Sequence, residues 1–357
     1  DDFIVPLSQV TFQSSLGTQA ARLDRLRALV GDVSPYVPDI DRDQAMRAAQ
    51  ICKADLTSEM VYEFPELQGV MGRYYAERGH EAQAVADACR DHYAPLGPTD
   101  DCPRAPVSVA VALADKIDLL TGFWTIDEKP TGSKDPFALR RAALGVIRIV
   151  VDNGLRLPLL PVIESANAAL LAQGVEHKAE NISGDLLRFI HDRLKVHLKG
   201  EGIRHDVIDA CLGMPGADDI ALVVARARAL EPFLANSDGE NLLQGYKRAN
   251  NILTAEEKKD GIEYSLDPDV NFAETDTERQ LFAALDVGEA AIGPALQAED
   301  FAAALRAMSA LRAPIDEFFE AVQVNADNQI VRRNRLCLLH RIRSIMGRIA
   351  MFDAVNG

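Results

Sequence analysis

The segments EFPELQGVMGRYYA (residues 63–76) and PTGSKDPFALRRAALGVIRIV (residues 130–150) are the most distinctive stretches of this sequence. Each combines Gly, Pro, charged and apolar residues in an order that helical periodicity alone does not require. The rest of the chain is rich in Ala and Leu, and aromatic residues make up only 6% of its 357 residues. Such a composition is typical of packed helices rather than of a β-sandwich. The length predicts two or three domains, each with a core of its own.

Apolar residues recur at spacings of three and four along most of the chain, which is the pattern of helices with one buried face. The segments that we expect to be helical include residues 41–63, 80–92, 135–153, 184–198, 205–212, 218–234, 240–253, 277–292, 301–324 with a break near Pro314, and 328–352. Residues 3–18 alternate instead and predict a small residual β element at the N-terminus. Because an isolated strand cannot satisfy its own backbone, we expect the chain to begin inside a larger protein. The predicted fold class is all-α, with several helical domains.

Charge and cysteine usage restrict the function further. A net charge of −16 would by itself repel a nucleic acid, although binding depends on the local field. The five cysteines are scattered and lack any CxxC pair, so neither a disulfide framework nor a structural zinc site is expected. The sequence has no long apolar run and no signal-peptide pattern. We therefore expect a cytoplasmic protein with reduced thiols, no bound metal, and neither a membrane nor a DNA partner.

Two short segments, ICKADL (residues 51–56) and ALADKID (residues 112–118), resemble the Asp-bearing helices of HD-type metal phosphohydrolases. Enzymes of that type hold a divalent ion with several ligands, one of them a His beside an Asp, and leave a position open for water. Asp55 and Asp115 remain as candidate ligands. A metal-dependent phosphohydrolase is therefore the alternative function for this chain.

The paired His of that site is missing, because Lys53 or Ala54 stands in its place. Neither can bind a metal ion, since Ala has no donor atom and Lys is positively charged at neutral pH. We therefore favour an inherited, metal-free helical scaffold. In such a scaffold Asp55 and Lys116 are expected to form an ion pair, and Asp118 is expected at the surface.

The loop PTGSKDP directly precedes a predicted helix, whose free N–H groups would favour an anion. Asp135 is expected as the N-cap and Pro136 as the first helical residue, with the helix ending near Asn153 and Gly154. The loop lacks the spacing of a nucleotide-binding loop. Two interpretations stay open: a rigid turn that caps the helix, or a contact to RNA backbone or to a partner subunit. The residues that would make such a contact are Ser133, Lys134, Arg140 and Arg141.

The clearest functional signal lies in residues 328–352, which hold six arginines and no acidic residue. An apolar stripe predicts the buried face of this helix, and its members are Val331, Leu338, Ile342, Ile345 and Ile349. On a helical wheel Arg333, Arg341 and Arg348 lie opposite the stripe, whereas Arg332, Arg335 and Arg343 flank it. Such a helix is either a solvated face with salt bridges or a surface for RNA. Because the helix itself has no acids to neutralise these arginines, we favour RNA.

Residues 63–76 and 130–150 resemble the β subunit of the bacterial two-subunit glycyl-tRNA synthetase. The segment YKRANNIL (residues 246–253) and the Arg-rich end of the chain resemble the DALR anticodon-binding domain. The resemblance runs over nearly the whole chain. It implies the C-terminal part of a β subunit, which would bind tRNA(Gly) and recognise its anticodon during ATP-dependent glycylation.

In this family glycine activation belongs to a separate α subunit, so the resemblance implies no catalytic residue on this chain. The implied partners are tRNA(Gly) and the α subunit, and ATP and Mg would be used by the complete enzyme rather than bound here. The implied tRNA-binding residues are Lys247, Arg248, Asn251, Arg332, Arg333, Arg335, Arg341, Arg343 and Arg348. The implied domains are the tail of a preceding domain with a linker (residues 1–30), an HD-like helical domain (31–160), a helical middle region (161–238) and a DALR-type domain (239–357).

Overall fold

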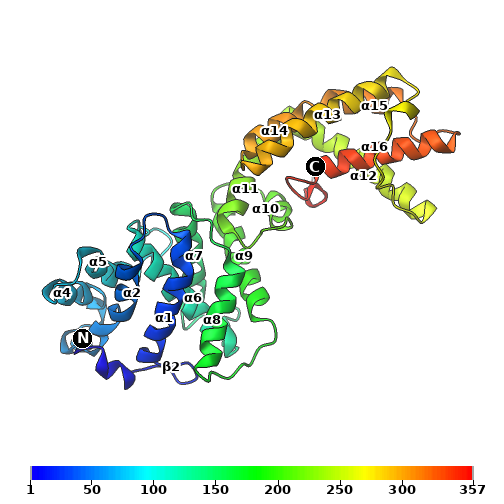
Figure 1. The fold of residues 1–357 in the computed structure, drawn as a ribbon. Coiled ribbons are helices and arrows are strands. Elements are labelled where there is room, and N and C mark those ends of the chain that lie inside the picture. The colour runs from blue at the N-terminus through cyan, green and yellow to red at the C-terminus, as the bar shows by residue number, and fades with distance from the viewer. Residues whose placement is uncertain (1, 356–357) are drawn as a thin grey trace. The chain divides into compact units, whose positions relative to one another are not determined.

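The structure is a computed structural model that describes residues 2–355. It is built almost entirely of helices (Figure 1), which confirms the predicted all-α class. Among the described residues the sheet structure is limited to one antiparallel pair of short strands, β1 (Thr11–Gln13) and β2 (Gly17–Thr18), apart from isolated bridges. The small β element expected near the N-terminus is therefore present.

The chain divides into two compact units. The first unit comprises the residues up to His197 together with Asp218–Ala221, and the second comprises Leu198–Ala217 together with the residues from Leu222 onward. The division into four parts that we expect from the sequence is finer than this one and stays a prediction.

The first unit is organised around one buried helix. Its helices are α1 (Gln19–Val33), α2 (Arg42–Ile51), α3 (Glu59–Glu63), α4 (Val70–Arg78), α5 (Gln83–Asp91), α6 (Pro106–Thr125), α7 (Leu139–Asp152), α8 (Leu159–Ala172) and most of α9 (Ile182–Gly200). Nearly every residue of α6 is buried, because α1, α2, α5, α7 and α8 pack around it (Figure 1). A helix that is apolar on all sides is expected in such a central position.

The predicted start of α7 is wrong by a few residues. Asp135 and Pro136 are not its N-cap and first residue; the helix begins at Leu139, after Ala138 in a left-handed conformation with φ 56°. The loop before it first closes a tight turn, and the carboxylate of Asp135 then accepts hydrogen bonds from the N–H groups of Leu139 (2.8 Å) and Arg140 (3.0 Å). Asp135 therefore caps the helix from a greater distance in the sequence than a standard N-cap. The predicted end of α7 is confirmed, with Asn153 as the C-cap.

The second unit is a bundle of long helices. Its helices are α10 (His205–Leu212), most of α11 (Ile220–Leu234), α12 (Ser237–Asp260), α13 (Asp276–Gln297), α14 (Phe301–Ser309), α15 (Arg312–Ala321) and α16 (Gln329–Met346). Helix α12 packs against α14, α15 and α16, and α13 packs against the same three helices. The break predicted near Pro314 is confirmed, because the chain leaves helical structure between α14 and α15.

The last helix is shorter than expected. It ends at Met346 rather than near Phe352, with Gly347 as its C-cap. Beyond it the chain folds back, so that the N–H of Met351 donates to the carbonyl of Ala210 (3.0 Å) and the ring of Phe352 packs against Tyr246 at 5.5 Å. These tertiary contacts hold the chain in a turn where apolar periodicity alone predicts more helix.

All five cysteines are buried free thiols. In the part of the chain that the structure describes, we find no helix with the length and apolar character needed to cross a membrane.

Candidate functional site

The buried face of α16 matches the predicted apolar stripe. Val331, Leu338, Ile342, Ile345 and Ile349 are all buried, which confirms that stripe. It fixes the rotation of the helix, and hence the direction in which each arginine leaves it. The six arginines of this region nevertheless have very different surroundings.

Arg335 is buried and forms an ion pair with Glu278 of α13. Its Nε lies 2.7 Å from Oε1 of Glu278, and the two side chains are 7% and 1% exposed. Glu278 also accepts hydrogen bonds from the backbone N–H (2.9 Å) and hydroxyl (3.0 Å) of Thr275, as part of a capping box at the start of α13. Burial alone would raise the pKa of Glu278, but the hydrogen bonds from Arg335 and Thr275 outweigh it and lower that pKa. Arg335 therefore joins α16 to the start of α13.

Arg332 makes contacts through all three of its guanidinium nitrogens. Nε donates to Oδ1 of Asn325 (3.1 Å) and Nη1 to the hydroxyl of Tyr264 (3.1 Å). Nη2 donates to Asp260 (2.6 Å) and to Glu256, both on α12. This arginine therefore holds α16 against the end of α12.

Two further arginines of α16 are also paired with acids of neighbouring helices. Arg341 forms ion pairs with Asp286 and Glu289 of α13, and Arg343 forms one with Glu257 of α12 at 3.1 Å. The absence of acids within the helix was therefore a misleading signal, because α12 and α13 supply them. Only the tertiary structure places those acids next to the arginines.

Arg333 and Arg348 are exposed and make no ion pair with the described residues. Arg333 borders a groove of about 510 Å³ whose other walls include Ile262, Leu266 and Phe272. Phe272 is 46% exposed and Leu266 59% exposed, so the groove offers apolar and aromatic surface beside a cation. That combination suits an unstacked nucleic-acid base with its phosphate.

Arg248 borders a second groove. Its guanidinium lies 4.6 Å from the centre of the Phe319 ring, and the groove, of about 560 Å³, is also lined by Ile252 and Asn325. Because Asn325 accepts a hydrogen bond from Arg332, which lines the first groove, the two grooves are neighbours. Arg248 and Arg333 therefore flank adjacent grooves.

The remaining predicted residues of the second unit are more scattered. Lys247 is half-buried and Asn251 exposed on α12, in the same stretch as Arg248. Arg348 lies in the turn after α16, and the part of α16 between Arg333 and that turn is roughly 20 Å long. The structure therefore does not bring Arg348 to the two grooves.

The loop before α7 does not offer a free helix N-terminus, because Asp135 already accepts hydrogen bonds there. Ser133 and Lys134 are exposed in the tight turn. Arg140 donates to the carbonyl of Gly132 at 2.7 Å and so stabilises the loop. Arg141 is exposed and borders a separate cavity.

The polar core of the first unit corrects two sequence predictions. Asp118 is not a surface group: it is buried, and Nε of Arg25 lies 2.6 Å from its Oδ1. Lys116 does not pair with Asp55, since its ammonium donates to the carbonyls of residues 92–94 at 2.9–3.2 Å. Both groups are held inside because α6, which carries them, is enclosed by other helices.

Asp55 instead caps α4. One carboxylate oxygen, Oδ2, accepts hydrogen bonds from the N–H groups of Gly69 (2.6 Å) and Gly72 (3.0 Å). Gly69 has φ +80°, a conformation that glycine adopts without strain. Burial raises the pKa of Asp55, and the two N–H groups oppose that shift. The two glycines of the segment 63–76 therefore bind a carboxylate that lies 14 and 17 positions earlier in the sequence.

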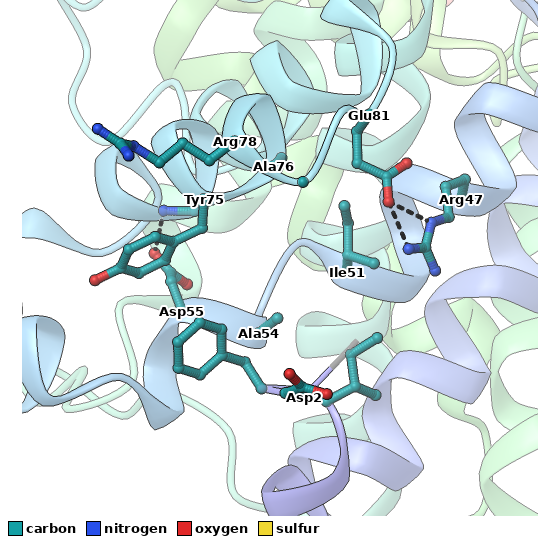
Figure 2. Close-up of a pocket in the computed structure, with 13 residues that line it drawn as sticks. Asp2, Arg47, Ile51, Ala54, Asp55, Tyr75, Ala76, Arg78 and Glu81 are labelled. Carbon is teal, nitrogen blue, oxygen red and sulfur yellow. Dashed lines mark hydrogen bonds and ion pairs between the residues drawn. The ribbon is translucent and has the colours of Figure 1, made fainter.

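A pocket of about 490 Å³ lies beside this contact. Figure 2 shows the ion pair of Arg47 and Glu81 at one side of it, with Tyr75 and Asp55 at another. The second carboxylate oxygen of Asp55, Oδ1, is buried with no hydrogen-bond partner among the described residues. Within residues 2–355 we find no group of three or more His, Cys, Asp or Glu side chains arranged to hold a metal ion.

Replacing Gly72 by alanine tests the role of this contact. The added Cβ would lie 3.1 Å from Oδ2 of Asp55, which two backbone N–H groups hold in place. We expect a loss of about 1–3 kcal/mol in the free energy of unfolding, measured by urea denaturation. Gly200→Ala is the control, because a Cβ at Gly200 would have no neighbour within 4 Å. Equal stability of the two variants would contradict the proposed role of Gly72.

Comparison with known proteins shows to which family the chain belongs. Residues 1–213 match the family model described as glycyl-tRNA synthetase beta subunit, which covers more than half of the chain. The chain belongs to the glycyl-tRNA synthetase beta-subunit family. Residues 242–350, which contain α16 and both grooves, match the model of the DALR anticodon binding domain. The two family matches thus fall on different parts of the chain.

Individual members of the glycyl-tRNA synthetase beta-subunit family are similar over almost the whole chain. A glycine–tRNA ligase beta subunit of Ruegeria sp. (strain TM1040) is 59% identical over 100% of this chain and 50% of its own length. One from Cereibacter sphaeroides (strain ATCC 17023) is 61% identical over 98% of this chain and 50% of its own length. One from Rhodospirillum centenum is 50% identical over 98% of this chain and 49% of its own length. The chain therefore spans about half the length of the curated relatives that it matches.

Proposed function

We propose that this chain is the C-terminal part of the β subunit of a heteromeric glycine–tRNA ligase. Its task is to bind tRNA(Gly) and to recognise the anticodon during ATP-dependent glycylation. Family membership supports the assignment, together with the DALR match over residues 242–350. The observation that carries the binding function is the exposed Arg333 beside an apolar groove within that match.

The division of labour follows from the same assignment. Glycine activation belongs to a separate α subunit, which is the proposed protein partner, and ATP and Mg serve the complete enzyme. This chain contributes binding and discrimination, which work through differences in affinity rather than through chemistry. We assign no catalytic residue to it and place its activity in the cytoplasm.

The residues proposed to contact tRNA differ in how much of each side chain is free. We propose that Arg333 and Arg248 bind phosphates or base edges at the two grooves, and that a base stacks on the ring of Phe272. Lys247 and Asn251 are proposed to extend this surface along α12. We propose that the remaining residues contact RNA backbone or the α subunit. They are Arg348 and, in the first unit, Ser133, Lys134, Arg140 and Arg141.

The four ion-paired arginines are proposed to support this surface rather than to form it. The guanidinium groups of these arginines form ion pairs with acids of α12 and α13; the residues are Arg332, Arg335, Arg341 and Arg343. An RNA phosphate would have to displace a carboxylate that is already in place. Their contribution to affinity is therefore expected to be indirect, through the position of α16.

Salt dependence distinguishes the two kinds of contact at the grooves. Arg333→Ala and Arg248→Ala should each weaken binding of tRNA(Gly) and reduce the slope of log affinity against log salt by about one unit per lost phosphate contact. Phe272→Ala should instead cost about 1–3 kcal/mol of binding free energy and leave that slope unchanged, because stacking releases no counterions. Fluorescence anisotropy at several salt concentrations measures both quantities.

Arg306→Ala serves as the control, since Arg306 is an exposed arginine on α14 outside both grooves. A tRNA with a substituted anticodon tests whether the lost contact reads sequence. If Arg333→Ala binds tRNA(Gly) with the affinity and salt slope of the unmodified chain, the first groove is not the binding surface.

A further inference from the structure

A second charged site lies in the first unit. It is a cavity of about 250 Å³ formed by α1, α6, the start of α7 and the segment after α5. Four positively charged side chains line it, and they are Arg22, Lys53, Lys116 and Arg141. Asp115 is the one carboxylate among the lining residues. Positive charge is therefore in excess at this cavity, although the whole chain has a net charge of −16.

The neighbouring charges do not remove this excess. Asp118 lies deeper and forms ion pairs with both Arg22 (3.1 Å) and Arg25 (2.6 Å), so Arg25 offsets its charge. The carboxylate of Asp55 accepts hydrogen bonds from Gly69 and Gly72 at the start of α4, so it does not pair with Arg141 or Lys116. Even when Asp55 is counted, the cations outnumber the carboxylates.

Burial makes this surplus costly. Arg22, Lys53 and Lys116 are each at most 5% exposed. Arg22 forms ion pairs with both Asp115 and Asp118, at 3.1 Å each, and its pKa is raised. The two lysines lose their protons more readily, because burial disfavours the charged form. Burial lowers the pKa of Lys53 and lowers that of Lys116 to about 8. An added negative charge in the cavity would relieve this cost.

The position beside Asp115 is already taken by a cation. The ammonium of Lys53 lies 2.9 Å from Oδ1 of Asp115 and 3.9 Å from the centre of the Tyr93 ring. Lys53 thus stands where a metal ion bound to Asp115 would have to stand. The charges that line this cavity therefore favour an anion over a metal ion.

Hydrogen-bond donors remain available for such an anion. An ammonium has three N–H groups, so Lys53 keeps one after its contacts with Asp115 and Tyr93. The hydroxyl of Tyr93 is buried without a hydrogen-bond partner among the described residues. Arg141 is exposed at the rim, where it makes no ion pair that the described residues provide. Lys116 contributes charge alone, because three backbone carbonyls already accept hydrogen bonds from its ammonium.

We propose that this cavity binds a tetrahedral oxyanion of the phosphate class, either free phosphate or the phosphate of a monoester. Lys53, Tyr93 and Arg141 bind its oxygens, and Arg22 and Lys116 supply positive charge around it. Apolar side chains at the rim, Leu96 and Phe137, are exposed and leave room for the organic part of a monoester. The site shares no residue with the two grooves of the second unit, but it uses Arg141, which is also among the residues proposed for contacts to RNA backbone or to the α subunit.

Calorimetric titration of the whole chain tests the proposal, in a phosphate-free buffer of low ionic strength. Inorganic phosphate and adenosine 5′-monophosphate are the probes, and adenosine is the uncharged control. We expect saturable binding of one phosphate-bearing ligand per chain, and a melting temperature that rises with ligand concentration. Equal affinity for the two probes assigns the site to free phosphate, and tighter binding of the nucleotide assigns it to a monoester.

Arg141→Ala should weaken this binding at least tenfold, because it removes an exposed charge without disturbing the core. Arg27→Ala is the matched control, since Arg27 is an exposed arginine on α1 that does not line the cavity. Lys53→Met should abolish binding, and circular dichroism shows whether that variant is folded. Three results would overturn the proposal: no saturable binding of either probe, an equal loss in Arg141→Ala and Arg27→Ala, or binding of adenosine as tight as that of its monophosphate.

Discussion

Replacing Arg335 by alanine is expected to destabilise the second unit by about 3–5 kcal/mol, because it leaves the carboxylate of Glu278 buried without its cation. The geometry behind this value is an ion pair at 2.7 Å between side chains that are almost fully enclosed. Glu278 also belongs to the capping box at the start of α13, so the loss of its ion pair with Arg335 should loosen that helix as well. Urea denaturation followed by circular dichroism measures the change.

Arg333→Ala provides the comparison two positions away. Arg333 is exposed on the same helix, so its loss should change the free energy of unfolding by less than about 0.5 kcal/mol. The double variant Arg335→Met with Glu278→Leu should recover part of the stability, since no unpaired charge remains, but not all of it, because the capping box of Thr275 and Glu278 is lost. If Arg335→Ala were as stable as Arg333→Ala, the buried ion pair would not hold the bundle.

The same ion pair has a defined dependence on pH. The pKa of Glu278 is lower in the folded chain than its ordinary value. The ion pair therefore contributes stability at pH values above that ordinary pKa. This contribution is lost as the pH falls through the lowered pKa. The difference in stability between the unmodified chain and Arg335→Ala should therefore shrink in acid.

Asp118→Ala should have a comparable effect on the first unit. Its carboxylate lies 3.1 Å from Nε of Arg22 and 2.6 Å from Nε of Arg25, with all three side chains buried. Removing it leaves Arg25 without this carboxylate inside the core and Arg22 with Asp115 alone, so we expect a loss of about 3–5 kcal/mol. Thermal unfolding of this variant should begin in the first unit.

Asp24→Ala is the control for Asp118→Ala, because Asp24 is exposed on α1, the helix that carries both arginines. Its removal should change stability by less than about 0.5 kcal/mol. An Asp118→Ala chain that unfolds at the temperature of the unmodified chain would show that Arg22 and Arg25 do not depend on this carboxylate.

Much of the fold follows from local patterns in the sequence. The apolar stripe predicted the buried face of α16 from Val331 to Ile345, because the spacing of apolar residues within one helix determines which face is buried. The two motif segments pointed to the family for a different reason. In the first segment Gly69 and Gly72 donate to the carboxylate of Asp55, and a Cβ at Gly72 would lie 3.1 Å from its Oδ2, so a side chain there is disfavoured.

The partners of charged side chains could not be predicted in the same way. Arg335 is 57 positions from Glu278 in the sequence, and Arg25 is 93 positions from Asp118. The periodicity within one helix does not indicate which helix will pack beside it. A run of arginines without acids in the same helix therefore predicted a surface for RNA. Helix packing decided instead that four of those arginines are paired and that Arg333 is exposed at a groove. The sequence by itself determined the helices, their buried faces and the family, whereas tertiary structure alone decided which charges remain available to a ligand.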